Sequence, residues 1–473
     1  MNQTDYLAQD AVGLAALIAA REVGAAAVLE AALARAEAVN PAINAITLLL
    51  ADQARAAVKA GAPTGPLGGV PFLIKDLGAQ VVGTPTSAGS RLFADARAAA
   101  DSTLVSAYRR AGLVIFGKTN TPEFGLEPVT EPEAFGPSRN PWDVSRTPGG
   151  SSGGAAAAVA AGIVPAAHAS DGGGSIRTPA SCCGLFGMKP SRGRVSFAPA
   201  SEGWGGFSIQ HAVTRSVRDS AALLDAACAP QPGDPYAVAA PATPYAADVA
   251  RDPGPLRIAF MTGGLAIAAI DPECAAAVRG AARLCETLGH VLEEAVLPGD
   301  VAAMSAAAHS VISASVAAML DAEASRRGRP IEAGEIDDVS MAMYRRGQDV
   351  SGSRYVQALQ TAHAFGRVVA GFFERYDVLL LSTLGSPPIA VGALRGEPLD
   401  MRGYAERLFA FMPNTQAFNV TGQPAMSVPL ATSRAGLPMG LQFVGRTGDE
   451  ATLFRLAGQL ERAAPWAGRR APL

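Results

Sequence analysis

The chain has 473 residues, of which 49% are hydrophobic and 17% are charged. This composition supplies enough apolar side chains for a large core and excludes an intrinsically disordered chain. The net charge of −3 excludes the strongly basic field that nucleic-acid or anionic-membrane binding needs, so we expect a small-molecule partner.

The cysteines and the N-terminal residues bear on location and on metal binding. The five cysteines, with Cys182 next to Cys183, fit neither the paired spacing of a zinc site nor the even count of a disulfide framework. Residues 1–10 lack the basic and apolar segments of a signal peptide, and apolar runs are broken before the roughly 18 residues of a membrane span. We therefore expect a cytoplasmic protein with no metal, no cofactor, and no membrane or nucleic-acid partner. The sequence leaves a homodimer open.

Helix and strand patterns follow one another along the chain. A short, almost continuous apolar run at Val70–Lys75 predicts a buried strand that ends in a lysine. The other predicted helices lie within residues 12–39, ending at Asn40-Pro41, and at residues 48–60, 101–111, 155–161, 272–288, 301–327 and 354–376. The other predicted strands lie at residues 113–116, 163–167, 256–260, 377–381, 425–430 and 439–444.

This order of strands and helices predicts an α/β fold with a mixed central sheet and helices on both faces. A Pro-rich connector at residues 231–255 is too short to demand separate domains, and we find no internal repeat. We expect a single domain over residues 1–473. It would comprise N-terminal helices at 1–62, a core at about 65–230, and helices and strands on the substrate side at 256–473.

Two segments combine serine and glycine, residues 149–154 (GGSSGG) and residues 170–175 (SDGGGS). The three glycines before Ser175 present successive N–H groups without side chains, as an oxyanion hole beside a nucleophile requires. Taken alone, either segment could be a flexible linker. The apolar helix predicted between them and the strand-like run at Ile163–Ala167 place both segments inside a core.

A serine hydroxyl needs a neighbouring base, usually histidine and sometimes lysine. His168 is close to Ser175 in sequence, but it follows an apolar run, so we expect a packed residue at a strand end. Lys75 ends a buried strand, and loss of solvation lowers the pKa of a lysine until it can act as a base. The alternative, a strand-end lysine that extends into solvent, stays open on these residues alone.

Five motifs, in their order and spacing, closely resemble the amidase-signature family of serine hydrolases. They are residues 68–76 (GGVPFLIKD), 117–124 (GKTNTPEF), 148–154 (PGGSSGG), 171–179 (DGGGSIRTP) and 183–190 (CGLFGMKP). The resemblance also includes residues 40–45 and 418–425, so it covers nearly the whole chain. Within the family, residues 130–136, 139–143 and 271–275 are most similar to the branch of the 6-aminohexanoate cyclic-dimer hydrolases, the nylon-oligomer enzymes.

The resemblance implies an amidase that cleaves carboxamide-type C–N bonds in linear, cyclic or aryl amides, with carbamates (urethanes) as a further class. It implies that Ser175 is the acylated nucleophile, that Ser151 follows a cis peptide bond and relays the proton, and that Lys75 is the base behind it. The oxyanion would be received by N–H groups of Gly172, Gly173, Gly174 and Ser175. Supporting roles fall to Gly150, Ser152, Asp171 and Arg177.

The chain departs from the family pattern at two positions. Gly172 stands where Thr or another side chain is common, and Ala155 stands where Ser is usual. We expect a looser oxyanion loop at Gly172. The pocket is less well defined than the catalytic positions. We expect its walls at Phe124 and Gly125 and at residues 202–207, 383–387 and 411–416, with an apolar lining.

Two other motif matches fail on their context. Residues 112–119 (GLVIFGKT) match a phosphate-binding loop, but the middle is strand-like and Pro122 follows where a helix should run. Residues 149–153 match the GxSxG elbow of α/β-hydrolases, but a polar loop precedes Ser151 instead of a strand.

Two other functions are weighed against the amidase. The amidase-signature family also contains glutamine-dependent amidotransferase A-type subunits, which work with a partner that binds tRNA. The acidic balance and the stronger similarity to the nylon-oligomer branch argue against this alternative. A catalytically silent binding protein is disfavoured because Lys75, Ser151 and Ser175 fill all three catalytic positions.

Overall fold

The computed structural model describes residues 1–473 apart from 62–63, 201, 266–268 and 397–398. In this part of the chain, one 11-stranded sheet runs through the molecule. In spatial order its strands are β1 (Ile46–Leu49), β3 (Val114–Thr119), β2 (Pro71–Lys75), β4 (Ala166–Asp171), β6 (Ile209–Thr214), β5 (Phe186–Lys189), β10 (Ala425–Thr432), β11 (Pro438–Gly445), β9 (Val378–Ser382), β7 (Arg257–Phe260) and β8 (Val291–Glu294).

The sheet is mixed, which confirms the predicted fold class. Strand β2 pairs in parallel with β3 and β4, and β7 pairs in parallel with β8 and β9, whereas the remaining neighbours are antiparallel. Because β2 has a strand on each edge and contacts helices as well, all five of its residues are buried. This burial explains the continuous apolar run that ends at Lys75.

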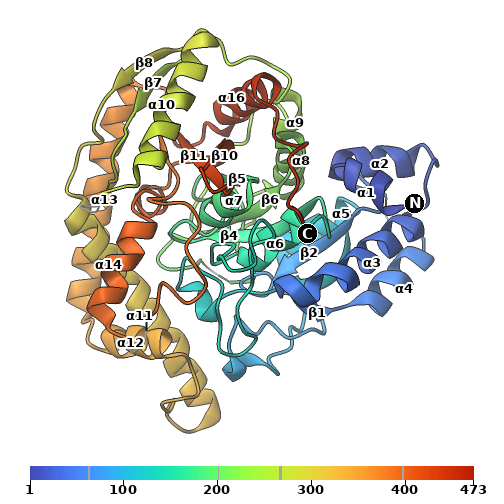
Figure 1. Ribbon diagram of the computed structural model, residues 1–473. Helices are drawn as coiled ribbons and strands as arrows, with labels where there is room; N and C mark the ends of the chain where they lie inside the picture. Colours follow the sequence, from blue (N-terminus) through green and yellow to red (C-terminus); the bar gives the residue numbers. More distant parts are fainter. Residues whose placement is uncertain (62–63, 201, 266–268, 397–398) are drawn as a thin grey trace.

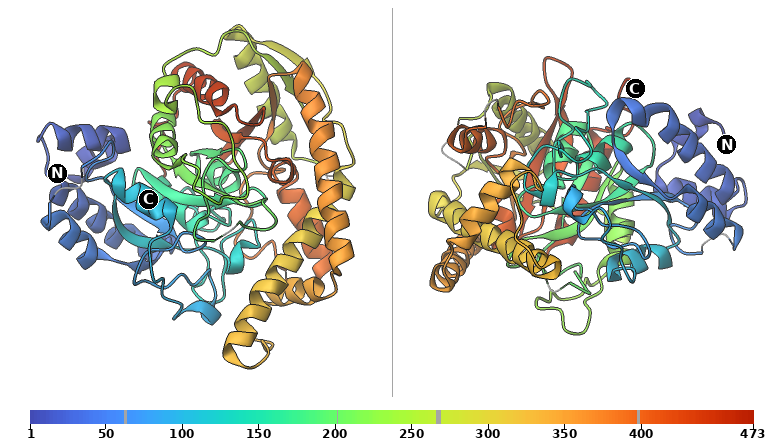
Figure 2. Two further views of the ribbon diagram at one scale, coloured as in Figure 1. Left: turned by 180° about the vertical axis from the view of Figure 1, so that it is seen from behind. Right: turned by 90° about the horizontal axis from the view of Figure 1, so that it is seen from below.

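Helices surround the sheet, with two groups at opposite ends of the molecule (Figures 1 and 2). The N-terminal group is α1 (Gln3–Ala8), α2 (Ala11–Ala19), α3 (Ala25–Ile43) and α4 (Ala51–Lys59), and the far group is α11 (Val301–Arg327), α12 (Asp338–Gln348), α13 (Gly352–Arg375) and α14 (Met401–Phe411). The others are α5 (Thr103–Arg110), α6 (Gly153–Ala160), α7 (Arg177–Cys183), α8 (Val217–Ala227), α9 (Tyr245–Asp248), α10 (Pro272–Thr287), α15 (Ala417–Thr421) and α16 (Glu450–Ala463).

Helix α11 is long and apolar enough, by length and composition, to cross a membrane. Half of its most apolar window is buried inside the structure, where Val311, Val316 and Leu320 pack in the core. A core helix of a globular domain passes the same test, so α11 is weak evidence for a membrane span.

Several predicted boundaries are wrong, for identifiable reasons. Helix α3 continues through Pro41 and ends at Asn44, whose left-handed backbone (φ 47°) suits asparagine. The helix expected at residues 48–60 is β1 followed by α4, because the first residues of that segment pair with β3. Strand β4 begins at Ala166 instead of residue 163.

Three elements around the serine-glycine segments were not predicted. Helix α7 carries Pro179 and follows directly on glycines, so it has no helical pattern to detect. Strand β5 is short, and β6 contains Gln210 and His211, which interrupt its apolar run. Both polar side chains are nonetheless buried, because Gln210 bonds to His168 and His211 bonds to Ser220.

The two misleading motifs have the structures expected of them. Residues 114–119 form β3 instead of a phosphate loop, and Lys118 Nζ donates to Asp76 at 3.0 Å. Ser151 is preceded by a loop and followed by α6, so it does not stand on a strand-to-helix elbow.

Gly154 tests the close packing of α6 on the sheet. A Cβ at this position would lie 2.5 Å from Asn120 N and 2.6 Å from Ala45 O, and backbone atoms cannot move aside cheaply. Gly154→Ala is therefore expected to lower the free energy of unfolding by about 2 kcal/mol or more. Gly371→Ala, at an exposed site in α13 with open space around it, is the control and is expected to raise the same quantity by about 0.5–1 kcal/mol. Equal effects of the two substitutions in thermal unfolding would contradict the close approach of α6.

Candidate active site

Lys75 stands at the C-terminal end of β2 and has no exposed surface. Burial lowers the pKa of Lys75 to about 7, and the negative charge of Asp171 opposes this shift only in part. A charged amine is costly to keep away from water, whereas a neutral amine is not. The lysine therefore has a substantial neutral fraction at physiological pH, as the sequence predicted for a base, and it does not extend into solvent.

Lys75 brings the two serine-glycine segments together. Its Nζ lies 2.7 Å from Ser151 Oγ and 3.0 Å from Ser170 Oγ, both within hydrogen-bond distance. Ser152 Oγ donates to the carbonyl oxygen of Ser170 at 3.1 Å, so the same two segments are also tied through the backbone. The peptide bond between Gly150 and Ser151 is cis. A Cβ at Gly150 would collide with the backbone of Val129, which explains the glycine there.

Ser175 lies in the turn between β4 and α7 and is 9% exposed, so its hydroxyl is close to the surface of an otherwise buried site. Among the described residues, we find no hydrogen-bond partner for the main-chain N–H groups of Gly172, Gly173, Gly174 and Ser175. Buried N–H groups are almost always paired. Four adjacent unpaired donors beside a serine therefore form a ready site for a negatively charged oxygen.

An ion pair fixes the turn that carries Ser175. The guanidinium of Arg177 donates to both carboxylate oxygens of Asp171 at 2.9 Å, and both side chains are fully buried. Asp171 also accepts the N–H of Ile176 at 3.1 Å. Burial alone would raise the pKa of Asp171, but the charge and hydrogen bonds of Arg177 outweigh it and hold that pKa at about 2. The pair has the supporting position that was predicted for it.

The same ion pair is anchored in the C-terminal part of the chain by residues that the sequence did not single out. Arg177 donates to Asn419 Oδ1 and Gln442 Oε1, each at 2.6 Å, and to the carbonyl oxygen of Thr415 at 2.9 Å. These partners lie more than 200 residues away in sequence, and no local pattern indicates them. The second hydroxyl beside Lys75, that of Ser170, was also missed, although its position at the end of a strand next to β2 was a usable signal.

Three of the four predicted wall segments approach the catalytic groups. A Cβ at Gly125 would lie 3.2 Å from Ser151 Oγ, so this segment flanks the candidate relay serine. A Cβ at Gly172 would meet Trp204, and one at Gly174 would meet Met412 and Thr415. Residues 383–387 instead support the 411–416 segment, through a hydrogen bond from Gly385 N to Phe411 O at 2.9 Å.

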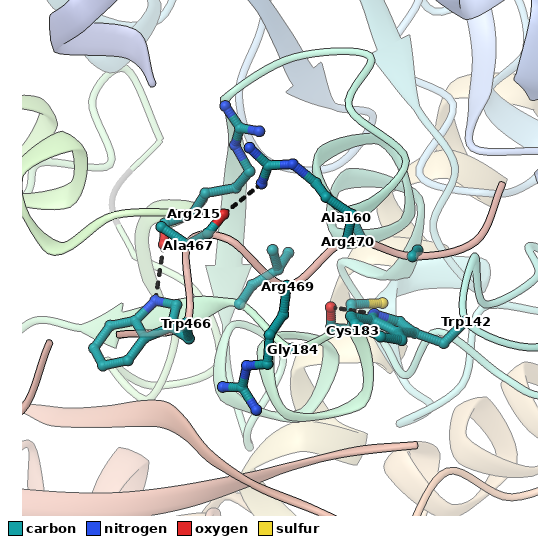
Figure 3. Close-up of a pocket in the computed structure, with 11 residues that line it drawn as sticks. Trp142, Ala160, Cys183, Gly184, Arg215, Trp466, Ala467, Arg469 and Arg470 are labelled. Carbon is teal, nitrogen blue, oxygen red and sulfur yellow. Dashed lines mark hydrogen bonds between the residues drawn. The ribbon is translucent and has the colours of Figure 1, made fainter. Parts of the chain in front are cut away.

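A pocket between the C-terminal tail and the end of α7 is separate from these groups (Figure 3). Arg215 and Arg470 lie beside each other there, and the indoles of Trp466 and Trp142 donate to the carbonyl oxygens of Arg215 and Cys183. Its lining includes neither the lysine nor the serines of the candidate site.

His168 can be separated from the candidate catalytic groups by substitution. Its Nδ1 accepts the N–H of Lys75 at 3.2 Å and its Nε2 lies 3.1 Å from Gln210 Oε1, while burial and the charge of Lys75 lower its pKa to about 3. His168→Gln is therefore expected to lower the unfolding midpoint while folded protein keeps at least about a tenth of kcat, because the ring bonds to neither serine. A complete loss of turnover in protein that circular dichroism shows to be folded would make His168 the base.

Comparison with known proteins agrees with this geometry. The family model described as Amidase matches residues 27–454. The 6-aminohexanoate-cyclic-dimer hydrolase of Paenarthrobacter ureafaciens is 37% identical over 487 residues, which cover 100% of this chain and 98% of that protein. The enzyme of the same name from Pseudomonas sp. (strain NK87) is 38% identical over 490 residues, with the same coverage of 100% and 98%. A solved structure of 6-aminohexanoate cyclic dimer hydrolase has a TM-score of 0.93 at 37% identity, covering 98% of this chain and 99% of that one.

These similarities confirm the family and the branch that the motifs predicted. They run over the full length of the chain, and the proteins concerned are named as hydrolases of a cyclic amide. The chain therefore belongs to the amidase family, the amidase-signature hydrolases that act on C–N bonds.

Proposed function

We propose that this chain hydrolyses carboxamide-type C–N bonds through an acyl-enzyme on Ser175, with Ser151 and Lys75 as the proton relay. The observation that carries the proposal is the 2.7 Å contact between the amine of a fully buried lysine and the hydroxyl of Ser151. A lysine with a pKa of about 7 can take up and release a proton near neutral pH.

The proposed reaction begins when Ser175 Oγ attacks the carbonyl carbon of the amide. The proton of Ser175 passes to Ser151 Oγ, and the proton of Ser151 passes to Lys75 Nζ. The N–H groups of residues 172–175 stabilise the negative oxygen of the tetrahedral intermediate. Lys75 then returns a proton through Ser151 to the leaving nitrogen, the C–N bond breaks, and the amine departs. Water attacks the acyl-enzyme by the same relay and releases the acid and Ser175.

The proposed substrate is a small uncharged amide, linear, cyclic or aryl. Two relatives named for a cyclic dimer of 6-aminohexanoate support this class. The side chains beside the glycine turn, Trp204 and Met412, are largely apolar, which favours neutral substrates over charged ones. A carbamate presents the same carbonyl–nitrogen bond, so urethanase activity is the second class to test. Short aliphatic amides, anilides, cyclic amides and small carbamates form the panel.

The amidotransferase subunit is not favoured as an alternative. The relatives that match over the whole chain are named as hydrolases of a cyclic amide. Glutaminase activity that appears only when partner subunits are added would favour the alternative.

Ser175→Ala tests the nucleophile. Because only Ser175 bonds to the substrate in this proposal, its loss is expected to reduce kcat by about a thousandfold or more while the fold is retained. An organophosphonate serine probe should label the wild type at Ser175 and leave the variant unlabelled. Ser325→Ala, on the exposed end of α11, is the control and should behave as wild type. Labelling of the Ser175 variant at another serine, with activity kept, would refute the assignment.

Lys75→Ala tests the relay by the nature of the leaving group. An amide nitrogen must be protonated to leave, whereas the phenoxide of an activated ester leaves without a proton. Lys75→Ala is therefore expected to lower kcat/KM for the amide at least about tenfold more than for the ester of the same acyl group. Ser151→Ala should fall between wild type and Lys75→Ala, because water can bridge part of the gap. Equal losses on amide and ester would identify another residue as the proton donor.

The pH profile tests the state of Lys75. Only the neutral amine accepts the proton, so kcat/KM should rise with pH and reach half its plateau near pH 7, the value given by burial of the lysine. Between pH 6 and pH 8 the neutral fraction rises from about one tenth to about nine tenths. Lys75→Ala should lose this limb. A limb that persists in the variant would belong to a different group.

A further inference from the structure

Trp204 lies in an unusual backbone segment near the glycine turn. Trp204, Gly205 and Gly206 have φ values of 54°, 62° and 83°, so three successive residues adopt the left-handed region. A bulky residue rarely adopts this conformation, because its Cβ crowds the backbone. The turn is closed by hydrogen bonds from Phe207 N to Trp204 O at 3.2 Å and from Ser208 N to Gly203 O at 3.1 Å.

This tryptophan turn, residues 203–208, is held firmly by its surroundings. A Cβ at Gly205 would lie 2.8 Å from Val311 Cγ1 of α11, so the turn packs directly on that helix. Arg192 donates to the carbonyl oxygen of Gly206 at 2.6 Å and is itself fixed by the carbonyl oxygen of Asn419 at 2.9 Å. The indole of Trp204 also packs against the core cluster that α11 and α13 form with the sheet. The position of the indole is therefore set by the fold.

The edge of the indole occupies the space in which a side chain at position 172 would stand. A Cβ built on Gly172 lies 2.5 Å from Cζ3 and 2.6 Å from Cε3 of Trp204, and 3.0 Å from Ser208 Oγ. Real Cβ atoms essentially never come within 3.0 Å of another heavy atom. A side chain at position 172 and the indole in its present place therefore exclude each other.

A single amide group ties the tryptophan turn to the turn that carries Ser175. Asn419 Nδ2 donates to the main-chain oxygen of Asp171 at 2.8 Å, to Asp171 Oδ1 at 2.9 Å, and to the main-chain oxygen of Phe207 at 3.1 Å. Asp171 directly precedes the three glycines, and Phe207 closes the tryptophan turn. The distance between the indole and Gly172 is thus fixed from both sides.

The glycine turn is braced on its other side as well. Thr415 Oγ1 donates to the carbonyl oxygen of Gly173 at 2.5 Å, and Met412 Sδ would lie 3.0 Å from a Cβ on Gly174. Three consecutive glycines have large conformational freedom, and oxyanion stabilisation requires N–H groups already in position. The turn therefore depends on contacts supplied by other segments.

We propose that Trp204 is a positioning residue: its indole replaces the missing side chain at Gly172 and holds the N–H groups of residues 172–175 toward the oxyanion. This inference rests on the proposed acyl-enzyme function of Ser175. It also replaces the expectation of a looser loop at Gly172, because the freed space is filled from residues 203–208.

Trp204→Ala tests the positioning role through kinetics. The oxyanion forms during attack on amides and on esters alike, so kcat should fall at least about tenfold for both substrates by a similar factor, with KM changed less than about threefold. This pattern differs from that of Lys75→Ala, which depends on the leaving group. An unchanged kcat, or a change confined to KM, would overturn the proposal.

A double substitution separates positioning from a general loss of stability. Gly172→Ala alone should lower kcat, because its Cβ collides with the indole, and should shift the fluorescence of Trp204. The same substitution in Trp204→Ala should raise kcat at least about fivefold above Trp204→Ala alone, since the new methyl group restores part of the packing. Gly173→Ala, whose Cβ would make only an ordinary contact at 3.9 Å with Met412 Cε, is the matched control and should show no such rescue.

The outcomes distinguish this inference from the proposed function. If Ser175→Ala is inactive but the Gly172→Ala and Trp204→Ala losses simply multiply, the positioning role is wrong and the acyl-enzyme stands. If Ser175→Ala remains active, the acyl-enzyme proposal itself fails. The fluorescence assignment has its own control, because Gly172→Ala in a Trp204→Phe background should leave the emission of Trp142 and Trp466 unchanged.

Discussion

The candidate site depends on the burial of one amine. Lys75 ends a strand that has neighbours on both edges, so Nζ is solvated by the hydroxyls of Ser151 and Ser170 instead of by water. Loss of water disfavours the charged form and moves the pKa into the range where a lysine exchanges protons at neutral pH. A nearby carboxylate would reverse this effect, but Asp171 is neutralised by its own pair with Arg177. The ion pair therefore protects the neutral lysine as well as the shape of the turn.

The second requirement is that two glycine-rich turns hold their shape. Glycine permits close approach, for example of Gly150 to Val129, but it contributes no side chain to fix the backbone. The structure supplies the missing restraint from distant parts of the chain. Asn419 and Gln442 hold Arg177, and Thr415 holds Gly173. This long-range support explains why one continuous sheet joins the N-terminal and C-terminal halves.

The sequence predicted much of this arrangement and missed a definable remainder. The apolar run before Lys75 and the glycines before Ser175 carry their structure locally, and the family motifs order them. Strand β6 was missed because Gln210 and His211 are polar yet buried, and α7 was missed because Pro179 and the preceding glycines carry no helical period. Contacts such as Arg177 with Gln442 depend on the tertiary fold, and a left-handed tryptophan beside a glycine has no sequence signal.

The most direct test of the account is the pKa of the Lys75 amine itself. The chain's other lysines are Lys59, Lys118 and Lys189, so a protein labelled with ¹³C at the lysine side chains gives few signals, and Lys75→Ala identifies the relevant one. Titration by NMR should show this signal changing with a midpoint near pH 7 in the free enzyme. A midpoint near the value of about 10.4 for a solvent-exposed lysine would show a charged amine at neutral pH and would contradict its role as the base.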